Sequence, residues 1–238
     1  MKRSLTVLAI LAMSSSAFAV DNYNREKVLE LFAQYNPSVL QRADENETYN
    51  SILQELVDSY NGPENMDTRL ELIALIRNFD NSLALSVLDR RYGEIFLMGK
   101  MSGTDIDSAR EKYRSDVQTL IGKIWAVSVQ VQELRLQEYK EQLKTVKKDD
   151  SLPASEKKEN VDFLNKQIQN TRLEIKNLKK DPGTYIANVT DMYVLQTERN
   201  LAEQLLSAHQ QLQQETSLQA AQAENLKISY KNKKPVAK

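Results

Sequence analysis

The stretch that decides the fold is IWAVSVQVQELRLQEYKEQLKTV, residues 124–146. Its first half alternates valine with polar residues, as a half-buried strand would, and its second half spaces apolar residues among charges. Helical spacing explains both halves, because one apolar row with steps of three and four begins upstream and continues into the stretch. β-Branched residues lower helix propensity by roughly a few tenths of a kcal/mol each, so the valines do not prevent a helix. The row consists of Ile106, Ala109, Tyr113, Val117, Leu120, Ile124, Val127, Val131 and Leu134.

The same helix carries a second apolar row, offset from the first, and two offset rows predict two neighbouring helices. After the turn DDSLPAS, the next segment holds a three-four heptad spacing, which is typical of a coiled coil. A short turn makes two such helices antiparallel neighbours. The second row is Val129, Leu136, Tyr139, Leu143 and Val146, and the seam of the next segment is Val161, Leu164, Ile168, Thr171, Ile175 and Leu178.

Proline and glycine divide the rest of the chain into further helices, since proline in a helix interior costs about 3 kcal/mol. We expect helices near residues 28–35, 49–60 and 68–98, the third opening at a capping box that begins with Thr68. A further helix begins at Thr104 and contains the quoted stretch, and the last follows Pro182. A short extended piece at residues 184–190 is the alternative at that start. The last helix can join the coiled coil as its third helix through Val194, Leu201, Leu205, Ala208 and Leu212.

These elements predict an all-α protein with a helical base and a long antiparallel arm. The base covers residues 20–125, the coiled-coil hairpin or three-helix arm residues 126–215, and a weakly packed helix with a basic tail residues 216–238. At 1.5 Å per residue the longest helix would measure about 65 Å, so we expect an elongated molecule.

The first residues resemble a secretory signal peptide that is cleaved after Ala19. Lys2 and Arg3 precede a short apolar run, and Ala17-Phe18-Ala19 has the small-x-small form of a cleavage site. The chain has no cysteine, so neither a lipid anchor nor a disulfide is expected, and a bacterial periplasm is favoured over a eukaryotic secretory route. We therefore predict a soluble, exported, periplasmic protein without a transmembrane segment.

Charge gives little indication of a partner. The formal net charge of −1 does not favour nucleic acid. From Lys227 onward the chain has lysines and no acidic residue, and such a tail is usually solvated. Weak contact with an anionic surface is the alternative.

Residues that could support metal or cofactor chemistry are few. His209 is the only histidine, and its neighbours one helical turn away are Leu205, Leu206, Leu212 and Gln213. A lone histidine in such surroundings predicts an ordinary surface or interface residue, with a haem ligand as the alternative. Met98 and Met101 could bind Cu(I), but two methionines at a helix end more often fill a core.

Polar residues within the apolar helix at 68–98 present a similar choice. Arg77, Asp80 and Asn81 predict a buried pair or network, and a polar site is the alternative. Trp125 is expected to anchor the junction of base and arm. The chain has no nucleophile elbow and no glycine-rich phosphate loop. We therefore predict no catalytic, metal or cofactor site, and no enzyme.

The expected function is that of a non-catalytic exported scaffold, which binds a protein partner or a second copy through coiled-coil contacts. The row Val129, Leu136, Tyr139, Leu143 and Val146 is the candidate interaction stripe. In the alternative, that row is used internally, by the third helix of the chain's own coiled coil, which is the helix that follows Pro182. A second hypothesis is a periplasmic holdase chaperone for unfolded envelope proteins.

Overall fold

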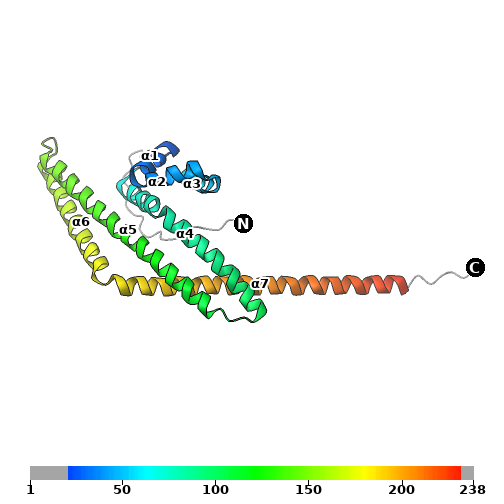
Figure 1. The fold of residues 1–238 in the computed structure, drawn as a ribbon. Coiled ribbons are helices and arrows are strands. Elements are labelled where there is room, and N and C mark those ends of the chain that lie inside the picture. The colour runs from blue at the N-terminus through cyan, green and yellow to red at the C-terminus, as the bar shows by residue number, and fades with distance from the viewer. Residues whose placement is uncertain (1–20, 232–238) are drawn as a thin grey trace, which may run out of the picture. The chain divides into compact units, whose positions relative to one another are not determined.

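The computed structural model describes residues 21–231, which form seven α-helices and no β-strand (Figure 1). The predicted all-α class is confirmed. The predicted signal peptide and the last part of the basic tail, residues 232–238, lie outside the described residues. The helices are α1 Arg25–Tyr35, α2 Pro37–Glu45, α3 Glu47–Ser59, α4 Met66–Ser102, α5 Asp107–Lys148, α6 Ala154–Lys180 and α7 Pro182–Lys231.

The chain divides into two compact units, Met1–Arg77 and Asn78–Lys238, and the division falls within α4. The border that the sequence suggested between base and arm, near residue 125, lies inside the single helix α5.

The first unit packs α1, α2, α3 and the start of α4 around a small apolar core. Val28 and Phe32 of α1 and Ile76 of α4 are fully buried there, and Leu53 of α3 is only 1% exposed. The side-chain amide of Asn36 donates a 3.0 Å hydrogen bond to the carbonyl oxygen of Ile76. This bond ties the junction of α1 and α2 to α4.

Helix α2 was not predicted. Its first residue, Pro37, had been interpreted only as a helix breaker, although proline is favourable in the first turn because its missing N–H needs no partner there. Only Val39 and Ala43 of this helix are buried. With three apolar residues in nine, Val39, Leu40 and Ala43, the helix is too short for a sustained periodic signal.

The predicted starts of two helices were wrong by a few residues. Helix α4 begins at Met66, and its cap is Asn65, whose Oδ1 accepts hydrogen bonds from the Thr68 N–H at 3.0 Å and the Thr68 hydroxyl at 2.7 Å. Helix α5 begins at Asp107 rather than Thr104, after a turn in which Gly103 has a φ of +67°. Glycine adopts that backbone conformation without a Cβ clash. Residues 184–190 are helical, not extended.

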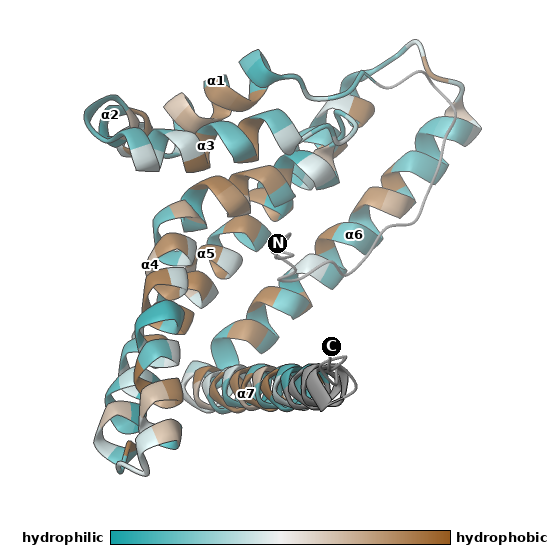
Figure 2. Cartoon of the chain, turned by 90° about the vertical axis from the view of Figure 1, so that its right-hand side faces the viewer, coloured by the Kyte–Doolittle hydropathy of each residue, from teal (hydrophilic) through white to brown (hydrophobic). Residues whose placement is uncertain are grey.

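The second unit contains the rest of α4, an α5–α6 hairpin and α7. In Figure 1, α6 runs back beside α5 from the turn at residues 149–153, and α7 crosses α5. Hydrophilic and hydrophobic turns alternate along α6 (Figure 2), as expected for a helix that buries one row. The core of this unit lies where α4, α5 and α7 meet, and it contains Leu85, Tyr92, Phe96, Tyr113, Val117, Leu120, Ile121 and Val194.

Candidate functional site

The predicted interaction stripe faces the other helix of its own hairpin. An ion pair joins α5 and α6 in antiparallel register, with Lys179 Nζ 2.6 Å from Glu133 Oε1. A second pair joins α6 to the turn, with Lys157 Nζ 3.3 Å from Asp150 Oδ1. In this register the stripe lies opposite the seam of α6. Val129 is buried, and the other members of the stripe, Leu136, Tyr139, Leu143 and Val146, are half-buried.

The seam residues of α6 occupy the matching side of the hairpin. Leu164, Ile168 and Thr171 are buried, and Val161, Ile175 and Leu178 are half-buried. This placement favours internal use of the stripe. The helix that uses it is α6, and not α7, which was the third helix of the coil in the alternative. A surface for another chain therefore has to be sought elsewhere.

Helix α7 packs against α4 and α5 through one face, which we call its inner face. Thr190 and Val194 on this face are buried, and Leu201 is half-buried. Gly93 of α4 leaves room for Leu201, since a Cβ at Gly93 would lie 3.2 Å from its Cδ2. The row predicted for this helix thus packs only in part, because Ala208 and Leu212 further along are exposed.

A carboxylate of α4 joins all three helices of this junction. The Tyr113 hydroxyl of α5 donates a 2.6 Å hydrogen bond to Asp89 Oδ1, and the Tyr193 hydroxyl of α7 donates one of the same length to Asp89 Oδ2. Asp89 is itself partly buried. Both of its oxygens are therefore occupied by tyrosines from two different helices.

A carboxylate of α7 makes the reciprocal connection. Glu198 Oε1 accepts hydrogen bonds from the Tyr92 hydroxyl at 2.7 Å and from Arg110 Nε at 2.6 Å, and Arg110 Nη2 donates to Oε2 at 3.0 Å. Burial raises the pKa of Glu198, but the bonds from Arg110 and Tyr92 outweigh it and hold the pKa below its usual value. Bidentate arginine–carboxylate pairs fix geometry as well as charge.

The tyrosines at this junction are held in their neutral form. Tyr92 and Tyr113 stack with ring centroids 4.2 Å apart. Burial, and then hydrogen bonding to the Glu198 and Asp89 carboxylates, raises the pKa of Tyr92, Tyr113 and Tyr193 above the usual 10.0. Their hydroxyls act as donors that fasten α7, and Asp89 and Glu198 are the two acceptors.

These raised pKa values predict a loss of stability in alkali. A tyrosine whose folded pKa exceeds its unfolded value stabilises the protein fully below about pH 10, and that contribution falls as pH rises through the folded pKa. We expect the free energy of unfolding in urea to fall above pH 10, by at most about 1.4 kcal/mol per pH unit for each such tyrosine. Tyr193→Phe should make this slope shallower. An unchanged slope would contradict the assignment.

The opposite face of α7 carries an exposed apolar row. Its positions follow steps of three and four, and we call it the α7 outer row: Tyr185, Asn188, Met192, Leu195, Arg199, Ala202 and Leu206. Met192 is 67% exposed, Leu195 64% and Leu206 59%. Large apolar side chains repeated at this spacing are typical of a helix that packs on another helix. Sequence analysis did not identify this row.

Past the crossing with α4 and α5, the part of α7 up to Gln219 has no tertiary packing with the other described residues. All side chains from Leu206 to Gln219 are exposed. His209 lies in this part, and its Nε2 is 3.1 Å from the Gln213 amide nitrogen, one turn away. This agrees with the expectation of an ordinary surface residue.

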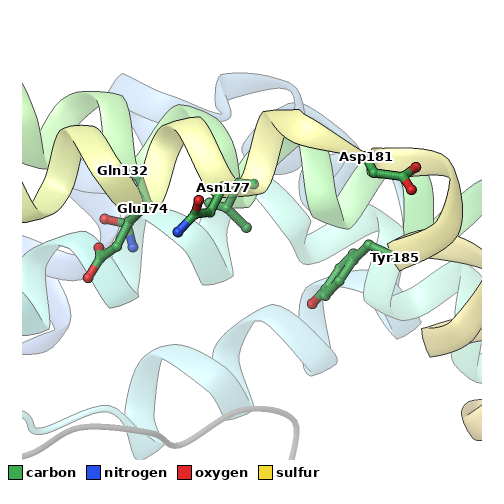
Figure 3. Close-up of a pocket in the computed structure, with 6 residues that line it drawn as sticks. Gln132, Glu174, Asn177, Asp181 and Tyr185 are labelled. Atoms are coloured by element: carbon green, nitrogen blue, oxygen red, sulfur yellow. The ribbon is translucent and has the colours of Figure 1, made fainter.

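A shallow cavity of about 420 Å³ lies where α5, α6 and α7 adjoin (Figure 3). It is lined by Gln132, Glu174, Asn177, Leu178, Asp181 and Tyr185. In the close-up, the Glu174, Asn177 and Gln132 side chains point the same way, and the Asp181 carboxylate points away from them. Asp181 Oδ1 instead accepts a 3.1 Å hydrogen bond from the Thr184 N–H at the start of α7.

The remaining residues singled out in the sequence are dispersed. Met98 and Met101 are 71% and 78% exposed, so their interpretation as core filler was wrong. They lie in the last turns of α4, just before the Gly103 turn. Arg77 lies over the Tyr35 ring at 5.3 Å, and the Asn81 amide donates to Asn78 Oδ1 at 3.3 Å.

Trp125, expected at a junction, is partly buried in α5, and its Nε1 has no hydrogen-bond partner among the described residues. Within residues 21–231, no group of three or more histidine, cysteine, aspartate or glutamate side chains is placed to hold a metal ion.

No helix in the described part of the chain has the length and hydropathy needed to cross a membrane.

Comparison of the chain with models of protein families, with curated proteins and with solved structures finds no match.

Proposed function

We propose that this chain is a non-catalytic, exported scaffold protein that binds through helix-to-helix contacts, and that the α7 outer row is its binding surface. The observation that carries the proposal is the two-sided nature of α7. Its inner face is fixed by the Asp89 and Glu198 hydrogen bonds, while Met192, Leu195 and Leu206 on the other face remain exposed. A repeated apolar row of this kind usually marks an interaction site.

The fixed inner face of α7 pre-organises the outer row for binding. Because α7 is joined to both α4 and α5 up to Leu201, the outer side chains from Tyr185 to Arg199 are presented on a rigid support rather than on a loose helix. Pre-organisation of this kind reduces the entropy lost on binding. A partner helix can then insert its own apolar side chains between those of the outer row.

The periplasmic location is part of the same proposal and depends on the first residues of the chain. Lys2, Arg3 and Ala17-Phe18-Ala19 support export and cleavage after Ala19. The absence of cysteine is consistent with it, since the protein then needs no oxidising step to fold.

Site-directed crosslinking tests the proposed surface. A photoreactive amino acid at Leu195 should give crosslinked species in cells, because that position would face a bound helix. The matched control is Leu173 on α6, which is exposed to a similar extent, 57% against 64%. Equal yields from both positions, or none from Leu195, would contradict the assignment of the outer row.

A holdase activity is the second candidate, and one observation favours it. Exposed large apolar side chains occur on α4 and α6 as well as on α7, among them Ile95, Met98, Met101, Phe163 and Leu173. Methionine-rich apolar surfaces suit binding of varied clients. Suppression of the aggregation of a denatured client by an equimolar amount of this protein would support this function, and no suppression would remove it.

A further inference from the structure

The described part of α7 consists of two halves that differ in their surroundings. From Pro182 to Leu201 its inner face packs on the core of the second unit. From Ala202 onward the same helix continues, and from Leu206 to Gln219 its side chains are exposed. Helices in proteins gain most of their stability from packing an apolar face. The second half therefore lacks the support that the first half has.

The outer row is self-complementary when two copies of α7 are placed antiparallel. With the two-fold axis between Asn200 and Leu201, Leu195 of one copy faces Leu206 of the other, and Met192 faces His209. The remaining pair is Arg199 opposite the small Ala202. Facing pairs at alternating steps of three and four residues fit the a-to-d layers of an antiparallel coiled coil. Each pair also occurs twice, as a two-fold axis requires.

Charge also fits this arrangement. Arg199 would lie next to Glu203 of the second copy, so the one cation in the row meets an anion. Within one copy Arg199 Nε already lies 3.4 Å from Glu203 Oε1. Two such pairs can therefore form a four-charge cluster at the centre of the interface without an unpaired arginine.

Within the second unit, α4 and α5 do not obstruct the contact. The outer row lies on the side of α7 opposite to Tyr193, Val194 and Glu198, which contact α4 and α5. These two helices therefore lie on the side of α7 away from the second copy. The unsupported half of each helix would cover the supported half of the other, and the exposed Leu206 would gain a neighbour.

From these observations we propose that the partner of the α7 outer row is a second copy of this chain, bound as an antiparallel two-fold dimer centred between Asn200 and Leu201. This inference rests on the proposed function, because it names the partner of the same surface. It also assigns the row a register that crosslinking can test.

Sedimentation analysis of the mature chain tests the dimer. The intact protein should show a concentration-dependent dimer, and Leu195→Glu should weaken the dimer at least tenfold by placing a charge opposite Leu206. Leu173→Glu, at a similarly exposed leucine on α6, should leave the dimer unchanged. Arg199→Glu should weaken the dimer and Arg199→Glu with Glu203→Arg should restore it. A monomer at all concentrations would overturn the inference.

Introduced cysteines test the register, since the chain has none of its own. Ala202→Cys should be joined to itself by a short thiol crosslinker, because the two positions lie one turn apart across the axis. Gln213→Cys should not, because two copies would be about 37 Å apart along the helix. A mixture of Gln213→Cys and Asn188→Cys should crosslink between chains. Efficient self-crosslinking of Gln213→Cys would indicate a parallel dimer and overturn the proposal.

The two proposals can fail separately. If the chain is monomeric but a photoreactive group at Leu195 captures a different protein, the outer row remains a binding surface and the second copy is excluded as its partner. If Leu195 captures neither a copy nor another protein, both proposals fail.

Discussion

The Asp89→Ala variant is expected to lose about 2–5 kcal/mol of the free energy of unfolding of the second unit. The substitution removes the acceptor for the Tyr113 and Tyr193 hydroxyls, each now bonded at 2.6 Å. A buried polar group left without a partner costs about 1–3 kcal/mol. This change leaves the Tyr193 hydroxyl without its acceptor and the Tyr113 hydroxyl with only Thr197 Oγ1, at 3.4 Å. Glu198 is the other carboxylate of this junction that accepts from two helices, through Tyr92 of α4 and Arg110 of α5.

Urea unfolding followed by circular dichroism measures this loss. Asp162→Ala, at an exposed aspartate on α6, is the control and should change the stability by less than about 0.5 kcal/mol. Asp89→Asn should fall between the two, because it keeps one acceptor oxygen. A loss for Asp89→Ala no greater than that of the control would show that the tyrosine bonds do not hold α7.

Phe32→Ala is expected to destabilise the first unit by about 3–5 kcal/mol. Phe32 of α1 is fully buried, and truncation of a buried phenylalanine combines lost apolar transfer with a cavity. A unit of this size has few other large side chains to compensate.

Limited proteolysis and denaturant unfolding can follow this change in the intact chain. Leu75→Ala, at a leucine that is 44% exposed on the same unit, should cost less than about 1 kcal/mol and serves as the control. Similar losses for the two variants would mean that Phe32 does not organise this core.

The hairpin was predictable because its signal is local and repeated. The rows that include Leu143 and Leu164 follow one spacing over many turns, and the five-residue turn between the helices leaves only an antiparallel arrangement. In the structure Leu164 and Ile168 are buried on the side that faces α5. What the pattern did not show was that the second row of α5 and the seam of α6 belong to the same contact.

Other features depend on residues far apart in sequence. The bond between Tyr193 and Asp89 joins positions separated by 104 residues, and no local pattern marks either as a partner. The cap at Asn65 was missed because the Thr68 capping box two residues inside the true start has a stronger sequence signature.

The sequence also did not show which side of α7 would remain exposed. The row through Val194 and Leu201 and the outer row through Leu195 and Leu206 have similar spacing and similar apolar content. Asn188 and Arg199 interrupt the outer row, which made it the weaker pattern. Only the packing of Val194 against the core shows that the opposite face is the exposed one.

Amide hydrogen exchange over residues 202–219 of the intact chain tests the central claim most directly, namely that the α7 outer row is covered by a second copy of this chain. A helix without tertiary support opens readily, and its amides exchange nearly as fast as those of an unfolded segment. We predict that exchange in this segment slows as protein concentration rises, and that Leu195→Glu abolishes the effect. Fast exchange at every concentration in the intact chain would contradict the account.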